Sequence, residues 1–232
     1  MQIRQILAVA AALTLQTLLV QAENTSRKVG DAEFNFAVPR EFCVLDEKNS
    51  RDAVFINVVT TLLKGAKNKL IVLTVNCERL KTWRAGENGN ILRYAMYYLP
   101  ENLENTTLPG ETKKLREDLC QDMRKQGDAT LSGVKDIVAN AAKELNANIA
   151  VSSTKYIGVV DEDEHGCYAA LLVGVKGADG KNIIMSSVVT STVVRGRAMF
   201  LAVYNEYKGP ETTQEDVDRS RIVLSDFDRA NP

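Results

Sequence analysis

The chain has 232 residues, 45% hydrophobic and 25% charged, and its 29 lysines and arginines nearly balance 30 acids. A net charge of −1 gives no broad basic surface, so we expect neither nucleic acid nor an anionic membrane as a partner. The single histidine, His165, excludes the zinc-protease motifs that need two histidines.

The first 22 residues are typical of a secretory signal peptide. Arg4 supplies a positive charge, an apolar run extends from Ile6 to Val20, and Val20 and Ala22 are small enough for a signal peptidase. We therefore expect cleavage after Ala22 and a secreted or periplasmic domain of residues 23–232. No later apolar stretch reaches 18 residues, and we expect no membrane anchor.

Apolar patterns predict strands and helices in the first half of this domain. Apolar and polar residues alternate over 33–38, which predicts a short strand. Residues 52–64 have apolar side chains every fourth position, as on a helix face, and 77–84 predicts a shorter helix. The continuous apolar run 70–75 predicts a strand buried on both faces, and 91–99 predicts another strand before Pro100.

Two helices are predicted after a loop at 101–110. The first covers 111–125 and ends at Gly127, and the second, over 131–145, has a clear apolar stripe. From residue 148 onward the pattern changes to strands, with tight turns at 177–180 and 195–196. The four strands predicted there cover 149–160, 167–175, 182–194 and 198–204.

The last helix is predicted to open with a capping box, Thr212-Thr-Gln-Glu215. Its inner face contains Val217, Leu224 and Phe227. Consecutive hairpins demand antiparallel pairing, because tight turns cannot join parallel strands. We therefore expect one α+β domain, a mostly antiparallel sheet covered by helices in a layered α/β/α arrangement.

Three segments resemble parts of the Mog1/PsbP-like group of domains. They are Phe34–Pro39, Arg195–Leu201 and the closing Asp228–Pro232, which match a first strand with a proline turn, a late hairpin around Gly-Arg, and a terminal helix. The chain is also similar to small exported bacterial proteins without assigned activity. The resemblance to the Mog1/PsbP-like group implies a non-enzymatic binding or accessory protein.

All four cysteines lie in the predicted mature domain. An even number in an exported protein favours disulfides, and four cysteines allow three connectivities. We favour Cys43–Cys77 with Cys120–Cys167, because elements that follow one another in sequence are usually neighbours in space.

The densest group of potential metal ligands is the acidic turn 161–166. Asp161, Asp163 and His165 imitate the opening of a calcium loop, but position five is a histidine and position twelve is Leu172 rather than a glutamate. We expect a solvated turn and at most weak divalent-cation binding, with no cofactor. His165 precedes Cys167 by two positions, yet a sulfur in a disulfide is no nucleophile.

A second cluster suggests a partner surface. Trp83 and Arg84 are residue types enriched in binding hot spots, and Tyr94 and Tyr98 share one face of a predicted strand. The alternative is that Trp83 packs in the core while Arg84 binds helix carbonyls.

The sequence therefore favours an exported, soluble, non-catalytic binding or accessory protein for an unknown protein or small ligand. The first alternative is a structural or host-directed secreted protein. The second is an enzyme with an unrecognised carboxylate-based site. Sequons at Asn24 and Asn105 matter only in a eukaryotic secretory pathway.

Overall fold

The structure is a computed structural model that describes residues 24–87, 91–127, 131, 133–146, 150–176 and 180–232. The predicted signal peptide lies outside the described residues. The strands are β1 Asn24–Val29, β2 Ala32–Ala37, β3 Phe42–Val44, β4 Asn68–Asn76, β5 Tyr94–Pro100, β6 Ala150–Glu162, β7 Cys167–Lys176, β8 Asn182–Val194 and β9 Arg197–Glu206. The helices are α1 Ser50–Gly65, α2 Cys77–Ala85, a 3-10 turn Glu101–Leu103, α3 Thr112–Gln126, α4 Val134–Glu144 and α5 Pro210–Ala230.

Seven strands form one antiparallel sheet in the order β3-β4-β5-β9-β8-β7-β6, and β1 and β2 form a separate hairpin. The predicted mixed α/β class with a mostly antiparallel sheet is confirmed. The turn between β8 and β9 uses Arg195 and Gly196 at φ 51° and 74°, the left-handed conformation that a tight two-residue hairpin requires.

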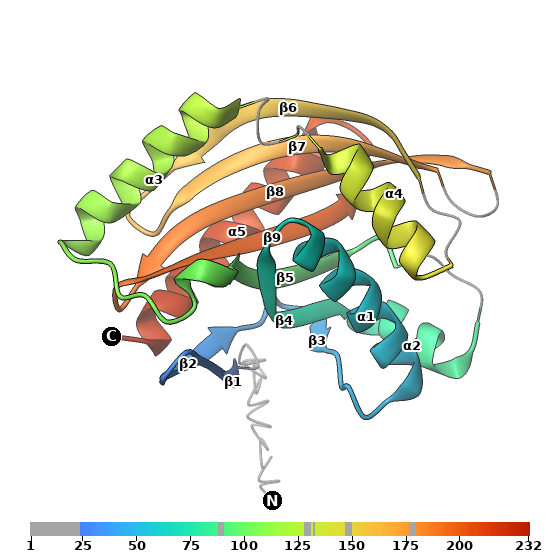
Figure 1. Ribbon diagram of the computed structural model, residues 1–232, viewed down its shortest axis with the longest axis horizontal. Helices are drawn as coiled ribbons and strands as arrows, with labels where there is room; N and C mark the ends of the chain where they lie inside the picture. The colour runs from blue at the N-terminus through green and yellow to red at the C-terminus, as the bar shows by residue number, and fades with distance from the viewer. Residues whose placement is uncertain (1–23, 88–90, 128–130, 132, 147–149, 177–179) are drawn as a thin grey trace, which may run out of the picture.

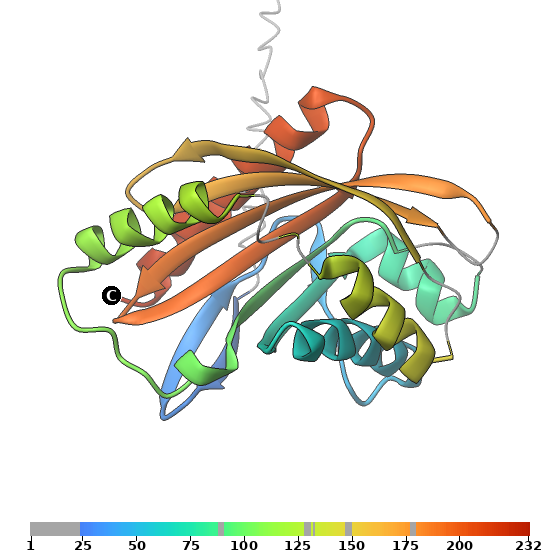
Figure 2. The same cartoon turned by 45° about the horizontal axis from the view of Figure 1, so that its top comes forward.

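Helices cover both faces of the sheet. On one face, α5 and β2 pack against the central strands, and the core there contains Phe34, Phe36, Tyr97 and Phe227. Phe36 stacks on Phe227 with ring centroids 5.1 Å apart, which fixes the hairpin against α5. On the other face, α1 and α2 cover β4, α3 crosses β6 to β8, and α4 contacts α1 and β6 (Figures 1 and 2).

The structure departs from the sequence predictions at three places. Strand β1 was not predicted because its side chains are mostly exposed and polar, and only its pairing with β2 defines it. Strand β3 has three residues, too few for a pattern. The predicted capping box is wrong: α5 begins at Pro210, and the buried Thr212 hydroxyl oxygen accepts the N–H of Lys208 at 3.1 Å.

Two disulfides tie elements to the sheet. Cys43 in β3 is joined to Cys77 at the start of α2, and Cys120 in α3 is joined to Cys167 in β7. This is the favoured pairing, and the sequence separations of the bonded cysteines are 34 and 47 residues. One disulfide lies at each end of the sheet.

Candidate functional site

The acidic turn between β6 and β7 organises its own backbone. One carboxylate oxygen of Asp163 accepts the N–H groups of His165 at 2.8 Å and Gly166 at 3.1 Å. Its other oxygen accepts the hydroxyl of Tyr168 at 2.8 Å. Asp163 therefore acts as the internal acceptor that shapes the turn.

The other predicted ligands in this turn point to different partners. Asp161 pairs with Arg221 of α5. The Nδ1 atom of His165 lies 2.7 Å from a carboxylate oxygen of Asp228, also in α5. Among the described residues, no group of three or more His, Cys, Asp or Glu side chains is placed to hold a metal ion.

Arg116 of α3 links this turn to the rest of the molecule. Its Nη2 donates to the Val193 carbonyl at 2.7 Å and to Asp228 at 2.8 Å, and its Nη1 donates to the Glu164 carbonyl. The side chain is 14% exposed. One guanidinium thus joins α3, β8, the acidic turn and α5.

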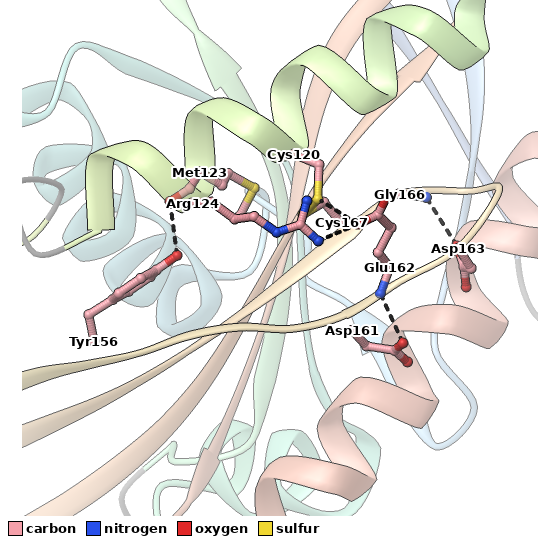
Figure 3. The surroundings of a disulfide bond; sticks show 9 residues. All are labelled: Cys120, Met123, Arg124, Tyr156, Asp161, Glu162, Asp163, Gly166 and Cys167. Atoms are coloured by element: carbon pink, nitrogen blue, oxygen red, sulfur yellow. Dashed lines mark hydrogen bonds and ion pairs between the residues drawn. A yellow bond between two sulfur atoms is a disulfide. The ribbon is translucent and has the colours of Figure 1, made fainter.

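Helix α3 is fastened to the sheet by further contacts around its disulfide (Figure 3). Arg124 points toward Glu162 of β6 and pairs with it, and the Tyr156 hydroxyl donates to the Met123 carbonyl at 3.1 Å. With the Cys120 sulfur bonded to β7, these contacts run along one side of the helix. The arrangement holds α3 over β6 and β7.

A shallow cleft of about 510 Å³ opens beside His165. Its lining includes Ser225, but within the described chain Ser225 makes no hydrogen bond to the His165 ring. The cleft's two arginines are paired, Arg221 with Asp161 and Arg229 with Asp226. Both cations are thus neutralised within the protein, and no nucleophile is paired with the histidine in the residues described.

In the predicted partner surface, Trp83 and Arg84 both make contacts within the molecule. The Trp83 indole N–H donates to the Arg51 carbonyl at 3.1 Å, and Arg84 pairs with the fully buried Asp52. Burial favours the neutral acid, but hydrogen bonds from Arg84 and a backbone N–H outweigh it and hold the pKa of Asp52 below its usual value.

The two predicted tyrosines share a sheet face, as expected, and lie in an aromatic row. Tyr94 stacks on Tyr204 at 4.4 Å, and Tyr98 stacks on Phe200 at 5.4 Å. Burial raises the pKa of Tyr94 and Tyr98 well above the ordinary tyrosine value. Trp83, Tyr94 and Tyr98 all pack, partly buried, against the same core cluster, and the role of the four predicted partner residues in binding stays a prediction.

One buried acid lacks the partners that Asp52 has. Asp216 of α5 is fully buried, and neither carboxylate oxygen makes a hydrogen bond of good geometry. Burial raises its pKa to about 6, and the nearby Ser186, Arg219 and Asn205 only partly oppose that effect. Asp216 is therefore a buried acid that titrates near neutral pH.

The second hollow runs along the outer edge of β4. Strand β3 pairs only with residues 74–76, and one further hydrogen bond joins the Leu45 N–H to the Leu73 carbonyl. Within the described residues, the stretch 68–72 has no strand partner on this side. A groove of about 560 Å³ follows that stretch, which we call the β4 groove.

Different elements line the β4 groove on its two sides. Ile56, Thr60 and Lys64 come from α1, and Arg27 comes from β1. Half-buried aliphatic side chains lie along the groove, including Leu70 and Ile71 of β4. The apolar run 70–75 predicts a strand with both of its faces buried. It does not show whether the strand lacks a hydrogen-bonded neighbour along one edge.

Sequence comparisons supply no relative: no protein-family model and no curated protein matches the chain. In the part of the chain that the structure describes, no helix is long and apolar enough to cross a membrane.

Proposed function

We propose that this is an exported, non-catalytic binding protein that takes up an extended segment of a partner protein along the free edge of β4. The main support for this proposal is that residues 68–72 of β4 have no strand neighbour on the side where the groove lies. An accessory role of this kind also agrees with the resemblance to Mog1/PsbP-like domains.

The chemistry of a free strand edge selects its ligand. Unpaired backbone N–H and C=O groups in a row are matched by another extended backbone, which supplies the same groups at the same spacing. Main-chain hydrogen bonds then give affinity, and side-chain subsites give specificity. A rigid small molecule rarely offers this alternation over several residues.

The size and lining of the groove support the same conclusion. A volume of about 560 Å³ falls within the range of protein ligand pockets. Aliphatic groups of Leu70 and Ile71 offer apolar surface beside the edge. The cleft beside His165, in contrast, is lined by charges already paired within the protein.

A matched pair of α1 variants tests the proposal. Thr60 and Asn57 are both exposed on α1, but only Thr60 lines the groove. Thr60→Trp fills the groove, and Asn57→Trp adds the same indole elsewhere on the helix. The mature chain and both variants are used as bait in native extract under non-reducing conditions, with mass spectrometry of what is retained.

We expect a protein retained by the unmodified chain and by Asn57→Trp, and lost with Thr60→Trp. Retention unchanged by Thr60→Trp contradicts binding in the groove. An empty result with all three baits contradicts a stable protein partner. Thermal melts of both variants verify that each is folded.

A further inference from the structure

We infer that the segment bound in the β4 groove is a single extended strand on a flexible tail or loop, with aliphatic side chains on both of its faces. This inference rests on the proposed function and specifies the partner. Two features support it: the groove is walled on both sides of the sheet edge, and aliphatic side chains lie on both sides of that edge.

The first wall is α1. The tight connection 66–67 returns the chain from α1 directly into β4, so the helix runs antiparallel to the strand and along its length. At 1.5 Å per helical residue and about 3.3 Å per strand residue, the span from Lys64 back to Ile56 matches the span of residues 68–72. This wall therefore follows the whole free stretch.

The second wall is the β1–β2 hairpin, which lies against the opposite face of the sheet. Arg27 of β1 lines the groove, and β1 contacts β4. Figures 1 and 2 show the hairpin and α1 on different sides of the sheet plane near β4. The free edge is recessed between the two.

A recessed edge excludes a folded partner sheet. The layers that cover a sheet pack about 10 Å from it, so a second folded edge entering the groove would bring layers that collide with α1 and β1. A second copy of this chain has the same recess at its own β4 edge and is excluded for the same reason. A lone strand has no covering layers and fits.

Aliphatic groups lie on both sides of the edge. Leu70 packs with the core under α1, as does Ile56, whereas Val44 and Ile71 pack with the core on the hairpin side. The irregular register between Leu70 and Val72 produces this arrangement, because it places Ile71 and Val72 together on the hairpin face. Successive side chains of a bound strand point to opposite sides of the sheet edge, and apolar surface is present on each side.

Charge does not select the ligand. Lys69 of the groove is already paired with Glu104 at 2.6 Å. Of the other charged lining residues, three are basic and three acidic, namely Arg27, Lys48, Lys64, Asp46, Glu47 and Glu101. The groove is thus nearly neutral, and a contiguous aliphatic run fits it better than an alternating apolar and polar one.

The test presents defined tails to the mature chain. The six-residue tails Ser-Val-Ile-Val-Ile-Ser, Ser-Val-Ser-Val-Ser-Ser and Ser-Val-Pro-Val-Pro-Ser are fused through a Gly-Ser linker to a soluble carrier, and affinity is measured by biolayer interferometry. We expect the first tail to bind at least about tenfold more tightly than the second, because it buries aliphatic groups on both walls. The proline tail lacks the backbone N–H at its third and fifth positions, which lie on one edge of an extended strand, and should bind more weakly than the first tail.

The outcomes separate this inference from the proposed function. Equal binding of the first two tails overturns the two-faced ligand but leaves strand addition in place. A concentration-dependent dimer that Thr60→Trp abolishes overturns the single strand, because a second copy would then occupy the groove. No binding of any tail, with the Thr60→Trp and Asn57→Trp baits retaining the same proteins, overturns the proposed function itself.

Discussion

The two edge regions of the sheet expose backbone in different ways. Strand β6 is the last strand at one end, and its pairing with β7 is interrupted by register shifts at three places along its 13 residues. At the other end, the free stretch 68–72 of β4 has one such shift and lies in a groove. Bulges are a common device against edge-to-edge association, and β6 uses it repeatedly.

Exposed apolar side chains do not by themselves identify a docking edge. Ile157 and Val160 of β6 are 46% and 42% exposed, more than the groove residues Leu70 and Ile71. Yet β6 offers a broken row of hydrogen-bonding groups, and β4 offers a shorter row between two walls. We therefore place binding at the less exposed edge.

The largest expected effects come from removing the disulfide at each end of the sheet. The cysteines are 34 residues apart in Cys43–Cys77 and 47 apart in Cys120–Cys167. Loop-closure entropy predicts that Cys→Ser at both positions of either bond lowers the free energy of unfolding by about 4 kcal/mol. Urea denaturation measures each loss.

The two losses should differ in their effect on binding. Without Cys43–Cys77, β3 is held to β4 by few hydrogen bonds, so the affinity for the two-faced tail should change. Without Cys120–Cys167, which lies at the β6 end, the affinity should stay the same. Equal changes in affinity would contradict the assignment of binding to the β4 end.

The next largest effect concerns the support of the β6 end. Arg116→Ala leaves the carboxylate of Asp228 without its cation and the Val193 and Glu164 carbonyls without a donor. We expect a loss of about 3 kcal/mol in unfolding free energy and unchanged tail binding. The control Arg124→Ala breaks only an exposed pair with Glu162 and should cost less than about 1 kcal/mol.

Asp216 belongs to neither edge region, so a change there should alter stability independently of the β4 groove and of β6. Its pKa of about 6 in the folded protein is above its unfolded value, so its favourable contribution is present below about pH 3.8 and is lost as the pH rises through 6. Asp216→Asn should raise the unfolding free energy at pH 7.5 by about 2 kcal/mol. The gain should vanish near pH 4, and a gain that persists at pH 4 would show another cause.

The smallest stability effects come from one substitution made at both edges. Ile71 and Ile157 lie at register shifts in β4 and β6. Lysine on a strand edge opposes pairing with another strand. Ile71→Lys should abolish tail binding and lower stability by about 1 kcal/mol, because Ile71 is partly buried, whereas Ile157→Lys should change stability by less than about 0.5 kcal/mol and leave binding intact.

Local patterns predicted much of the fold. The apolar run 70–75, the hairpin turn at Arg195 and Gly196, and the inner face of α5 are all set by neighbours in sequence, and the structure has each of them. The opening of α5 was mispredicted because Pro210 starts the helix before the capping motif. Proline favours the first helical turn, and this signal was present in the sequence.

The candidate site was beyond sequence reasoning for a physical reason. Whether β4 has a neighbour depends on where β3 stops, and three residues leave no periodic signal. The walls of the groove come from β1 and α1, which are separated in the chain by β2 and β3. Trp83 and the tyrosines are residue types enriched in binding sites, whereas the groove is built from ordinary aliphatic residues.

The most direct measurement is amide hydrogen exchange of the mature chain, with disulfides intact, in the presence and absence of the carrier with the Ser-Val-Ile-Val-Ile-Ser tail. Our account predicts new protection confined to residues 68–72 and the facing turns of α1, with no change over 150–162. Protection that appears along β6 instead, or no protection anywhere at saturating tail, would contradict the claim that β4 is the binding edge.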